Sequence, residues 1–189
     1  MGMESNIELM ILDRIQNIRT PAGDAVMCFI TRLGDAGIIW IVLAVILLLI
    51  PKTRKNGLVM MAALCIDLVV CNGILKNLFA RIRPCDVNTQ IQLLIARPDD
   101  FSFPSGHTAA SFAAVAALYF SGERRLWKPA LILACLIAFS RLYLYVHYPT
   151  DILGGILVGI AAGYAGNVMI RQCIKWKKRY YGQKKLREE

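Results

Sequence analysis

The sequence is poor in charge, and it has no soluble linker, low-complexity segment or internal repeat. Of its 189 residues only 19% are charged while 57% are hydrophobic, and the mean hydropathy is +0.50. An ordinary soluble domain of this length is more polar. The composition therefore excludes that class and indicates one integral membrane domain, residues 1–189, without room for a second.

Metal-type cysteine patterns are also missing. The six cysteines show no C-x-x-C and no other metal-ligand spacing. Cys65, Cys71 and Cys135 lie inside apolar runs, as small hydrophobic residues do. A disulfide between Cys28 and Cys85 is a disfavoured alternative. The cysteines therefore give no reason to expect a metal centre.

The formal net charge of +9 does not predict a nucleic-acid partner. The basic residues gather in short clusters between apolar runs, as they do beside membrane spans, and aromatic residues do not interleave with them on any exposed stretch. The expected partners are the lipid bilayer and a membrane lipid, and the sequence leaves the oligomeric state open.

The order of apolar runs predicts an all-α transmembrane bundle of five spans, with six as the alternative count. A helix over residues 7–18 has apolar residues on one face, which predicts an amphipathic interfacial helix. A break at residues 20–24 and a short helix at 25–33 complete an interfacial N-terminal region, residues 1–35, with the alternative that this short helix runs into the next span. The expected spans are residues 37–50 with an earlier helix start, 57–79, 105–120, 127–145 and 150–170. Residues 171–189 form a basic tail whose end we expect to fray.

A small polar turn opens directly onto the third apolar run. Pro104 stands where a helix can begin, and Ser105 and Gly106 leave backbone N–H groups at the helix N-terminus, where an anion binds well. His107 projects beside them. The turn indicates a phosphate site with an acid attached, and the alternative is an ordinary capped helix with a surface histidine.

Two further polar clusters lie at ends of spans that an alternating bundle brings to the same membrane face. Lys76 and Arg83 are seven residues apart, which places them on one helix face if the helix reaches that far, and Pro84 fixes where it stops. Their alternative role is to reach from the span to the interface. The other cluster is Ser140-Arg141, His147 and Asp151, in which the carboxylate can orient the imidazole. Two histidines and a carboxylate also suit a metal, which the surrounding cations disfavour.

These three clusters together match the motifs of a known family. Lys76 with Arg83-Pro84, then Pro104-Ser105-Gly106-His107, then Ser140-Arg141 with His147 and Asp151 stand at the spacings of the type 2 phosphatidic acid phosphatase family. The match runs from residue 76 to residue 151 without a departure, and the chain resembles the small bacterial members.

The resemblance implies an all-helical phosphatase that uses no metal or other cofactor. His147 would be the nucleophile that forms a phosphohistidine, Asp151 would orient it, and His107 would protonate the leaving oxygen and later activate water. The implied phosphate-binding residues are Lys76, Arg83, Ser105, Gly106 and Arg141. An electrostatic cage of this kind supplies most of the stabilisation in phosphoryl transfer.

The resemblance favours a polyprenyl diphosphate such as undecaprenyl diphosphate as substrate, with phosphatidylglycerol phosphate or phosphatidic acid as the alternative. Vanadium haloperoxidases share the motifs, but they are soluble. A lipid or anion carrier would explain the spans and cations without requiring His107, His147 and Asp151 together.

Charge asymmetry predicts the orientation in the cell membrane. Cations are in excess in three segments, which are the turn at residues 51–57, the turn at 122–128 and the C-terminal tail. Because successive spans run in opposite directions, these segments lie on the membrane face opposite the polar clusters. Cation-rich segments stay in the cytoplasm, so the catalytic face is expected outside. Asp67, in the second span, is expected to line a polar pocket beneath the site or to pair with another span.

Overall fold

The structure is a computed structural model that describes the backbone of residues 3–188 and the side chains of residues 7–180. Over this range the chain is helical and contains no strand, which confirms the all-α prediction. The helices are α1 (Met3–Asn17), α2 (Pro21–Leu33), α3 (Ile38–Leu49), α4 (Arg54–Asp67), α5 (Lys76–Phe79), α6 (Pro84–Val87), α7 (Gly106–Ser121), α8 (Trp127–Tyr143) and α9 (Pro149–Glu188), with a 3-10 turn η1 (Asp35–Gly37) and a π-helical stretch η2 (Leu68–Leu75).

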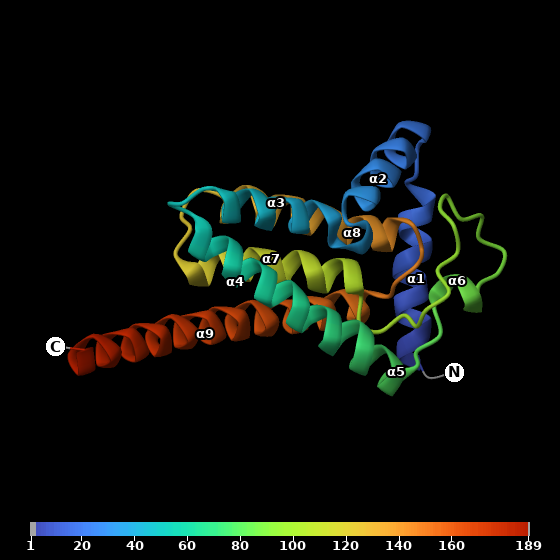
Figure 1. The fold of residues 1–189 in the computed structure, drawn as a ribbon. Helices are drawn as coiled ribbons and strands as arrows, with labels where there is room; N and C mark the ends of the chain where they lie inside the picture. Colours follow the sequence, from blue (N-terminus) through green and yellow to red (C-terminus); the bar gives the residue numbers. More distant parts are fainter. Residues whose placement is uncertain (1–2, 189) are drawn as a thin grey trace.

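Five helices, α3, α4, α7, α8 and α9, run side by side, while α1 lies across one end of the bundle and α2 projects from it (Figure 1). Helix α7 is central and packs against α4, α8 and α9. The bundle buries large side chains such as Trp40, Met60 and Ile137. The Trp40 indole N–H donates to Ser111 Oγ over 3.0 Å, so this buried polar group is satisfied inside the core.

Glycines in α9 let it approach α7 closely. A Cβ on Gly159 would lie 2.4 Å from the Ala109 carbonyl oxygen, and one on Gly155 would lie 2.8 Å from the Ser105 carbonyl oxygen. Neither backbone oxygen can move away without disturbing α7. These glycines therefore give α9 a small-residue face, which fixes the start of α9 beside the start of α7.

Two helical segments are long and apolar enough to cross a membrane, Arg54–Val87 and Pro149–Tyr180. Pro21–Leu33 and Asp35–Leu49, bent by 45° at their junction, form a third if the pair is one span. Helices α7 and α8 have 16 and 17 residues, fewer than the roughly 20 that a straight crossing needs. The count of five spans and the interfacial position of α1 therefore stay predictions.

Several predicted helix boundaries are wrong. The break after α1 lies at residues 18–20 and not at 20–24, because Thr20 caps α2 by accepting from the Gly23 N–H at 3.1 Å and Pro21 occupies the first turn. Lys76 and Arg83 do not share a helix, because Ala80 (φ 43°) ends α5 and Arg83 is extended. Helix α9 continues to Glu188, well past residue 170, where the fifth span is predicted to end. The alternative Cys28–Cys85 disulfide is also absent, as both thiols are free.

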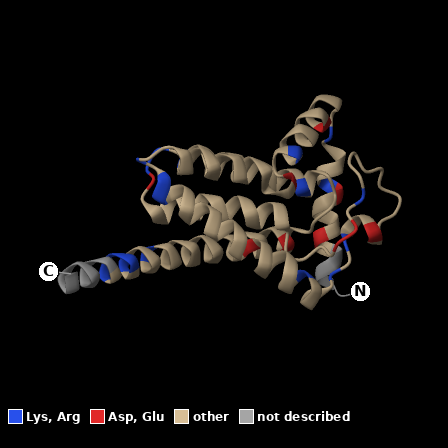
Figure 2. Ribbon diagram, in the orientation of Figure 1, with Lys and Arg blue, Asp and Glu red and all other residues tan. Residues whose placement is uncertain are grey.

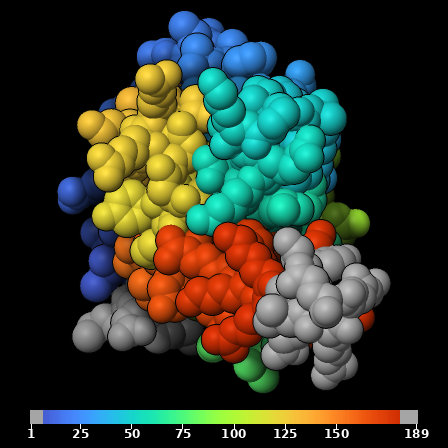
Figure 3. Space-filling model, turned by 60° about the vertical axis from the view of Figure 1, so that its left-hand side comes forward, coloured from blue at the N-terminus to red at the C-terminus, as the bar shows by residue number. Residues whose placement is uncertain are grey.

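Charge is distributed unevenly along the bundle. Lys and Arg residues mark the end that carries the α3–α4 and α7–α8 turns and continue along α9, whereas most acidic residues lie toward the other end (Figure 2). Seen from the basic side, the α3–α4 turn in cyan, the α7–α8 turn in yellow and α9 in red form one continuous surface (Figure 3). The bundle therefore has a basic end, and α1 crosses the opposite end.

Candidate active site

His147 lies in the loop between α8 and α9 and is 1% exposed. Its Nδ1 faces Asp151 Oδ2 at 3.5 Å and Ser102 Oγ at 3.4 Å, while its Nε2 lies 3.1 Å from Arg83 Nη1. A guanidinium has donors only, so Nε2 must offer its lone pair and Nδ1 must carry the proton. The site therefore holds the imidazole with Nε2 as its nucleophilic atom.

The surroundings keep this imidazole neutral. Burial lowers the pKa of His147 to about 3, and the charges of Arg83 and Arg141 act in the same direction against the opposing effect of Asp151. A group with so low a pKa holds no proton on its second nitrogen at neutral pH. The lone pair that a nucleophile needs is therefore available over the whole physiological range.

Asp151 is fully buried in the first turn of α9, and each of its carboxylate oxygens has a partner. Oδ2 accepts from Ser102 Oγ at 2.5 Å and from the Tyr148 N–H at 2.8 Å. Oδ1 accepts from Arg81 Nη1 at 2.6 Å. The predicted partnership of Asp151 with His147 is present, and it is one part of a larger network.

Arg81 connects this carboxylate to the N-terminal helix. Its Nη2 donates to Glu8 Oε2 at 2.5 Å, and its guanidinium stacks on the Tyr148 ring at 4.0 Å. Glu8 in turn accepts from the Thr150 N–H and hydroxyl at 3.0 and 2.7 Å. No motif in the sequence marks Arg81 or Glu8 for this role, although Arg81 stands two positions before the Arg83-Pro84 pair.

Arg83 and Lys76 meet at one acidic residue that the sequence analysis also missed. Lys76 Nζ pairs with Asp100 Oδ2, and Arg83 Nη2 pairs with Asp100 Oδ1. Arg83 further donates to the carbonyl oxygens of Asp100 at 2.8 Å and Val146 at 2.7 Å. The two cations therefore converge, as predicted, through a loop residue and not through a shared helix face.

Arg141, near the end of α8, is 4% exposed. Its Nη1 donates to Thr31 Oγ1 at 2.5 Å, and its Nε has no hydrogen-bond partner. A buried guanidinium with an unsatisfied donor is costly unless a ligand supplies the acceptor. This open donor fits the predicted role of Arg141 in binding a phosphoryl oxygen.

The turn before α7 differs in one respect from the prediction. Ser105 is the N-cap, its hydroxyl accepts from the Thr108 hydroxyl at 3.0 Å, and its own N–H donates to the Asp151 carbonyl at 3.1 Å. The expectation that this N–H is open to an anion is therefore wrong, and Pro104 stands one residue before the cap. Gly106 lies close to the side chain of Asn72, since a Cβ there would lie 2.9 Å from Asn72 Oδ1. His107 Nε2 lies 2.9 Å from Asp35 Oδ1.

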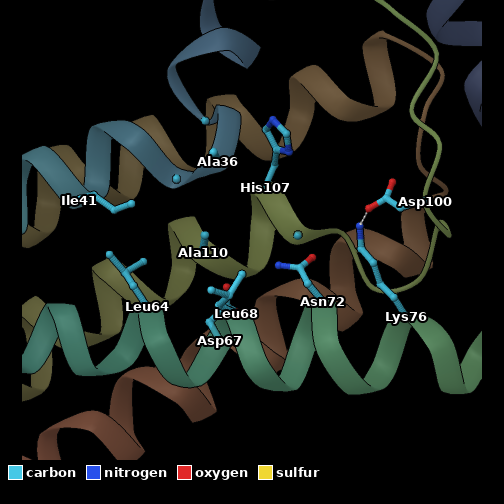
Figure 4. Close-up of a pocket in the computed structure, with 13 residues that line it drawn as sticks. Ala36, Ile41, Leu64, Asp67, Leu68, Asn72, Lys76, Asp100, His107 and Ala110 are labelled. Atoms are coloured by element: carbon cyan, nitrogen blue, oxygen red, sulfur yellow. Dashed lines mark hydrogen bonds and ion pairs between the residues drawn. The ribbon is translucent and has the colours of Figure 1, made fainter.

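A cavity of about 480 Å³ joins one side of this site to the bundle interior (Figure 4). Lys76, Asp100 and His107 line its polar end, and most of its lining toward α3 and α4 is apolar. The remaining lining residues include Ile41, Leu64, Leu68 and Ala110. Asp67 also lines it and is 2% exposed, with an Oδ1 that has no hydrogen-bond partner. The prediction that Asp67 lines a pocket is confirmed, but apolar side chains make up much of the lining of that pocket.

Comparisons with known proteins agree with the motifs. Residues 54–175 match the model of a family described as the PAP2 superfamily. The chain is 31% identical over 154 residues, 82% of its length and 73% of the relative's, to an undecaprenyl-diphosphatase of Sulfolobus acidocaldarius. It is 33% identical over 145 residues, 75% and 72% of the two lengths, to an undecaprenyl-diphosphatase of Bacillus subtilis. Among solved structures, a transmembrane phosphatidylglycerolphosphate phosphatase of Bacillus subtilis aligns with a TM-score of 0.74 at 26% identity, covering 91% of this chain and 88% of that one.

The state of His147 can be tested directly, because the chain has only two histidines. In the His107→Ala variant, labelled with ¹⁵N-histidine and studied by NMR, we expect the remaining imidazole to stay neutral from pH 5 to pH 8. Its folded-state pKa lies below that window, so no titration occurs within it. The chemical shifts should report a protonated Nδ1 and a bare Nε2. A titration midpoint near 6.5, or the opposite tautomer, would contradict this description of the site.

Proposed function

Because this chain belongs to the PAP2 superfamily, we propose that it removes phosphate from a membrane lipid through a phosphohistidine at His147, without a metal. It is a membrane-associated hydrolase of phosphoric ester or anhydride bonds, as its family and named relatives are phosphatases. The observation that carries the proposed mechanism is the bare Nε2 of His147, which lies beside Arg83 and is buried with its proton on the opposite nitrogen.

The reaction has two steps. His147 Nε2 attacks the phosphorus, the bond to the lipid oxygen breaks, and His107 gives that oxygen its proton. His107 then takes a proton from a water molecule, the resulting hydroxide attacks the phosphohistidine, and inorganic phosphate leaves with Nε2 restored. Asp151 holds the Nδ1 proton in place and balances the positive charge that develops on the ring.

The cations around Nε2 stabilise the transition state. Lys76, Arg83 and Arg141 are all nearly buried, so their charges act with little screening on the equatorial oxygens of the phosphoryl group. The Gly106 N–H at the start of α7 adds a backbone donor with the helix dipole in the favourable sense. Ser105 completes this binding turn by capping the helix and fixing its direction.

A polyprenyl diphosphate such as undecaprenyl diphosphate is the proposed substrate. Two relatives that cover most of this chain are named for that substrate, and the apolar walls of the cavity suit a hydrocarbon chain attached to the phosphate. Phosphatidylglycerol phosphate is the second candidate, because a structural neighbour over 91% of the chain carries that activity in its description.

We expect the purified protein in detergent to release phosphate from undecaprenyl diphosphate, and His147→Ala to lose at least about 10³-fold of kcat/KM. His107→Ala should lose roughly 10²–10⁴-fold, and Asp151→Asn less than His147→Ala, since it orients the base without reacting. The measurement is phosphate release at several concentrations of each lipid, so that kcat and KM are obtained separately.

Gln92→Ala, on the exposed loop, is the control and should match the wild type. Wild-type turnover in His147→Ala would disprove the mechanism. A higher kcat/KM for phosphatidylglycerol phosphate would replace the substrate but leave the mechanism intact. Lipid or anion transport without any phosphate release would favour a carrier.

We also propose that the site faces outward and the C-terminal tail faces the cytoplasm. The basic end of the bundle carries the turns at residues 51–53 and 122–126, and the site lies at the opposite end (Figure 2). We take the five helices that run side by side as five membrane crossings, which are α3, α4, α7, α8 and α9. Because cation-rich segments stay in the cytoplasm, the basic end then faces the cytoplasm and the site faces outward.

Cys85 cannot report the orientation, because it is 1% exposed. In a cysteine-free background, Ala96→Cys lies on the exposed loop at the site end, and Arg124→Cys lies on the exposed turn at the basic end. We expect a membrane-impermeant maleimide to label Ala96→Cys in intact cells with a permeable outer envelope, and Arg124→Cys only after lysis. The reverse pattern would overturn the orientation.

A further inference from the structure

The proposed phosphate cage already contains an acid. Asp100 places one carboxylate oxygen on Lys76 Nζ and the other on Arg83 Nη2. The Lys76 and Arg83 side chains are 8% and 2% exposed, whereas the Asp100 side chain is 53% exposed. Figure 4 shows Lys76 reaching from its helix to this carboxylate. Two buried cations are thus bridged by a half-exposed carboxylate, as two oxygens of a phosphoryl group would bridge them.

Arg83 does not depend on this carboxylate for its position. Its Nε donates to the Asp100 carbonyl oxygen at 2.8 Å, its Nη1 to the Val146 carbonyl at 2.7 Å and its Nη2 also to the Phe101 carbonyl at 3.3 Å. These backbone acceptors hold the guanidinium with or without the side chain of Asp100. The carboxylate can therefore swing outward about its own side-chain bonds while Arg83 and the loop backbone stay in place.

Asp100 is charged in the free protein. Burial raises the pKa of Asp100, but the hydrogen bond and charge of Lys76 and the charge of Arg83 outweigh it and lower the pKa to about 2. A phosphate monoester also carries between one and two negative charges near neutral pH. The two anions therefore compete for the same pair of cations.

We propose that Asp100 occupies the phosphoryl position in the free enzyme, yields it to a dianionic phosphate group, and returns to displace inorganic phosphate after hydrolysis. This assignment rests on the proposed function. Lys76, Arg83 and Arg141 together carry three positive charges, which would retain a phosphate dianion strongly in a buried site. A tethered carboxylate weakens the ground-state binding of substrate and product alike, and it shortens the time that product blocks the cage.

A supporting role for Asp100 predicts the opposite result. If the carboxylate served to hold Lys76 and Arg83 ready for phosphate, its removal would disorder the cage and weaken the binding of every phosphate ligand. The direction of the change in phosphate affinity therefore separates the two roles, and a general loss of structure cannot produce tighter binding.

The test is product inhibition of Asp100→Asn by inorganic phosphate. A charge-assisted hydrogen bond contributes enough to change affinity on the order of tenfold, so we expect the inhibition constant for phosphate and the KM for the lipid to fall by about that factor. Where phosphate release limits turnover, kcat should also fall, because the phosphate product would leave the variant more slowly. Asp99→Asn is the matched control, because it removes the same charge from the exposed neighbouring position, and it should behave as the wild type.

The same phosphate-inhibition measurement on Asp100→Ala is a second test, because this substitution removes the charge without leaving an amide that could bond to Lys76. Unchanged or weaker phosphate inhibition in both variants, with a wild-type melting temperature, would overturn the role of Asp100 while leaving the phosphatase intact. Absence of phosphate release by the wild type itself would instead contradict the proposed function.

Discussion

Three buried cations at one end of an apolar bundle impose the main constraint on this structure. Lys76, Arg83 and Arg141 have lost almost all contact with water, and each such charge costs several kcal/mol unless acceptors replace the solvent. Backbone carbonyls, Thr31 and the Asp100 carboxylate supply those acceptors in the free protein. Burial, together with the same positive charges, keeps His147 neutral, so the surroundings that attract a phosphate also prepare the nucleophile.

Helix packing fixes the positions of the residues around these cations. Close contact between α7 and the glycine face of α9 places Asp151 beside Ser105, whose N–H donates to the Asp151 carbonyl. From the other side, Glu8 in α1 holds Arg81 against the second oxygen of Asp151. The helix α1 is therefore bonded to the catalytic network, and its Glu8 is buried although an interfacial helix would be expected to expose it.

The sequence allowed the all-helical fold and the convergence of the motif residues to be predicted, because their spacing follows from local periodicity and from the alternation of helix ends. The sequence did not allow the roles of four other residues to be predicted, namely Asp100, Ser102, Arg81 and Glu8. Their roles depend on the path of a loop and on the docking of a helix, which no local sequence pattern encodes. Pro21 was misread because a proline in a first turn and a proline that breaks a helix look alike in sequence. The span count could not be fixed, as α7 and α8 are shorter than a full crossing.

The central claim is that His147 Nε2 takes the phosphoryl group from the lipid. Rapid acid-free quenching of the enzyme during turnover of ³²P-labelled undecaprenyl diphosphate, followed by peptide mapping, tests it most directly. The account predicts an alkali-stable, acid-labile label on the peptide that contains His147, and no label in His147→Ala. A label on another residue, or wild-type turnover with no labelled protein, would contradict it.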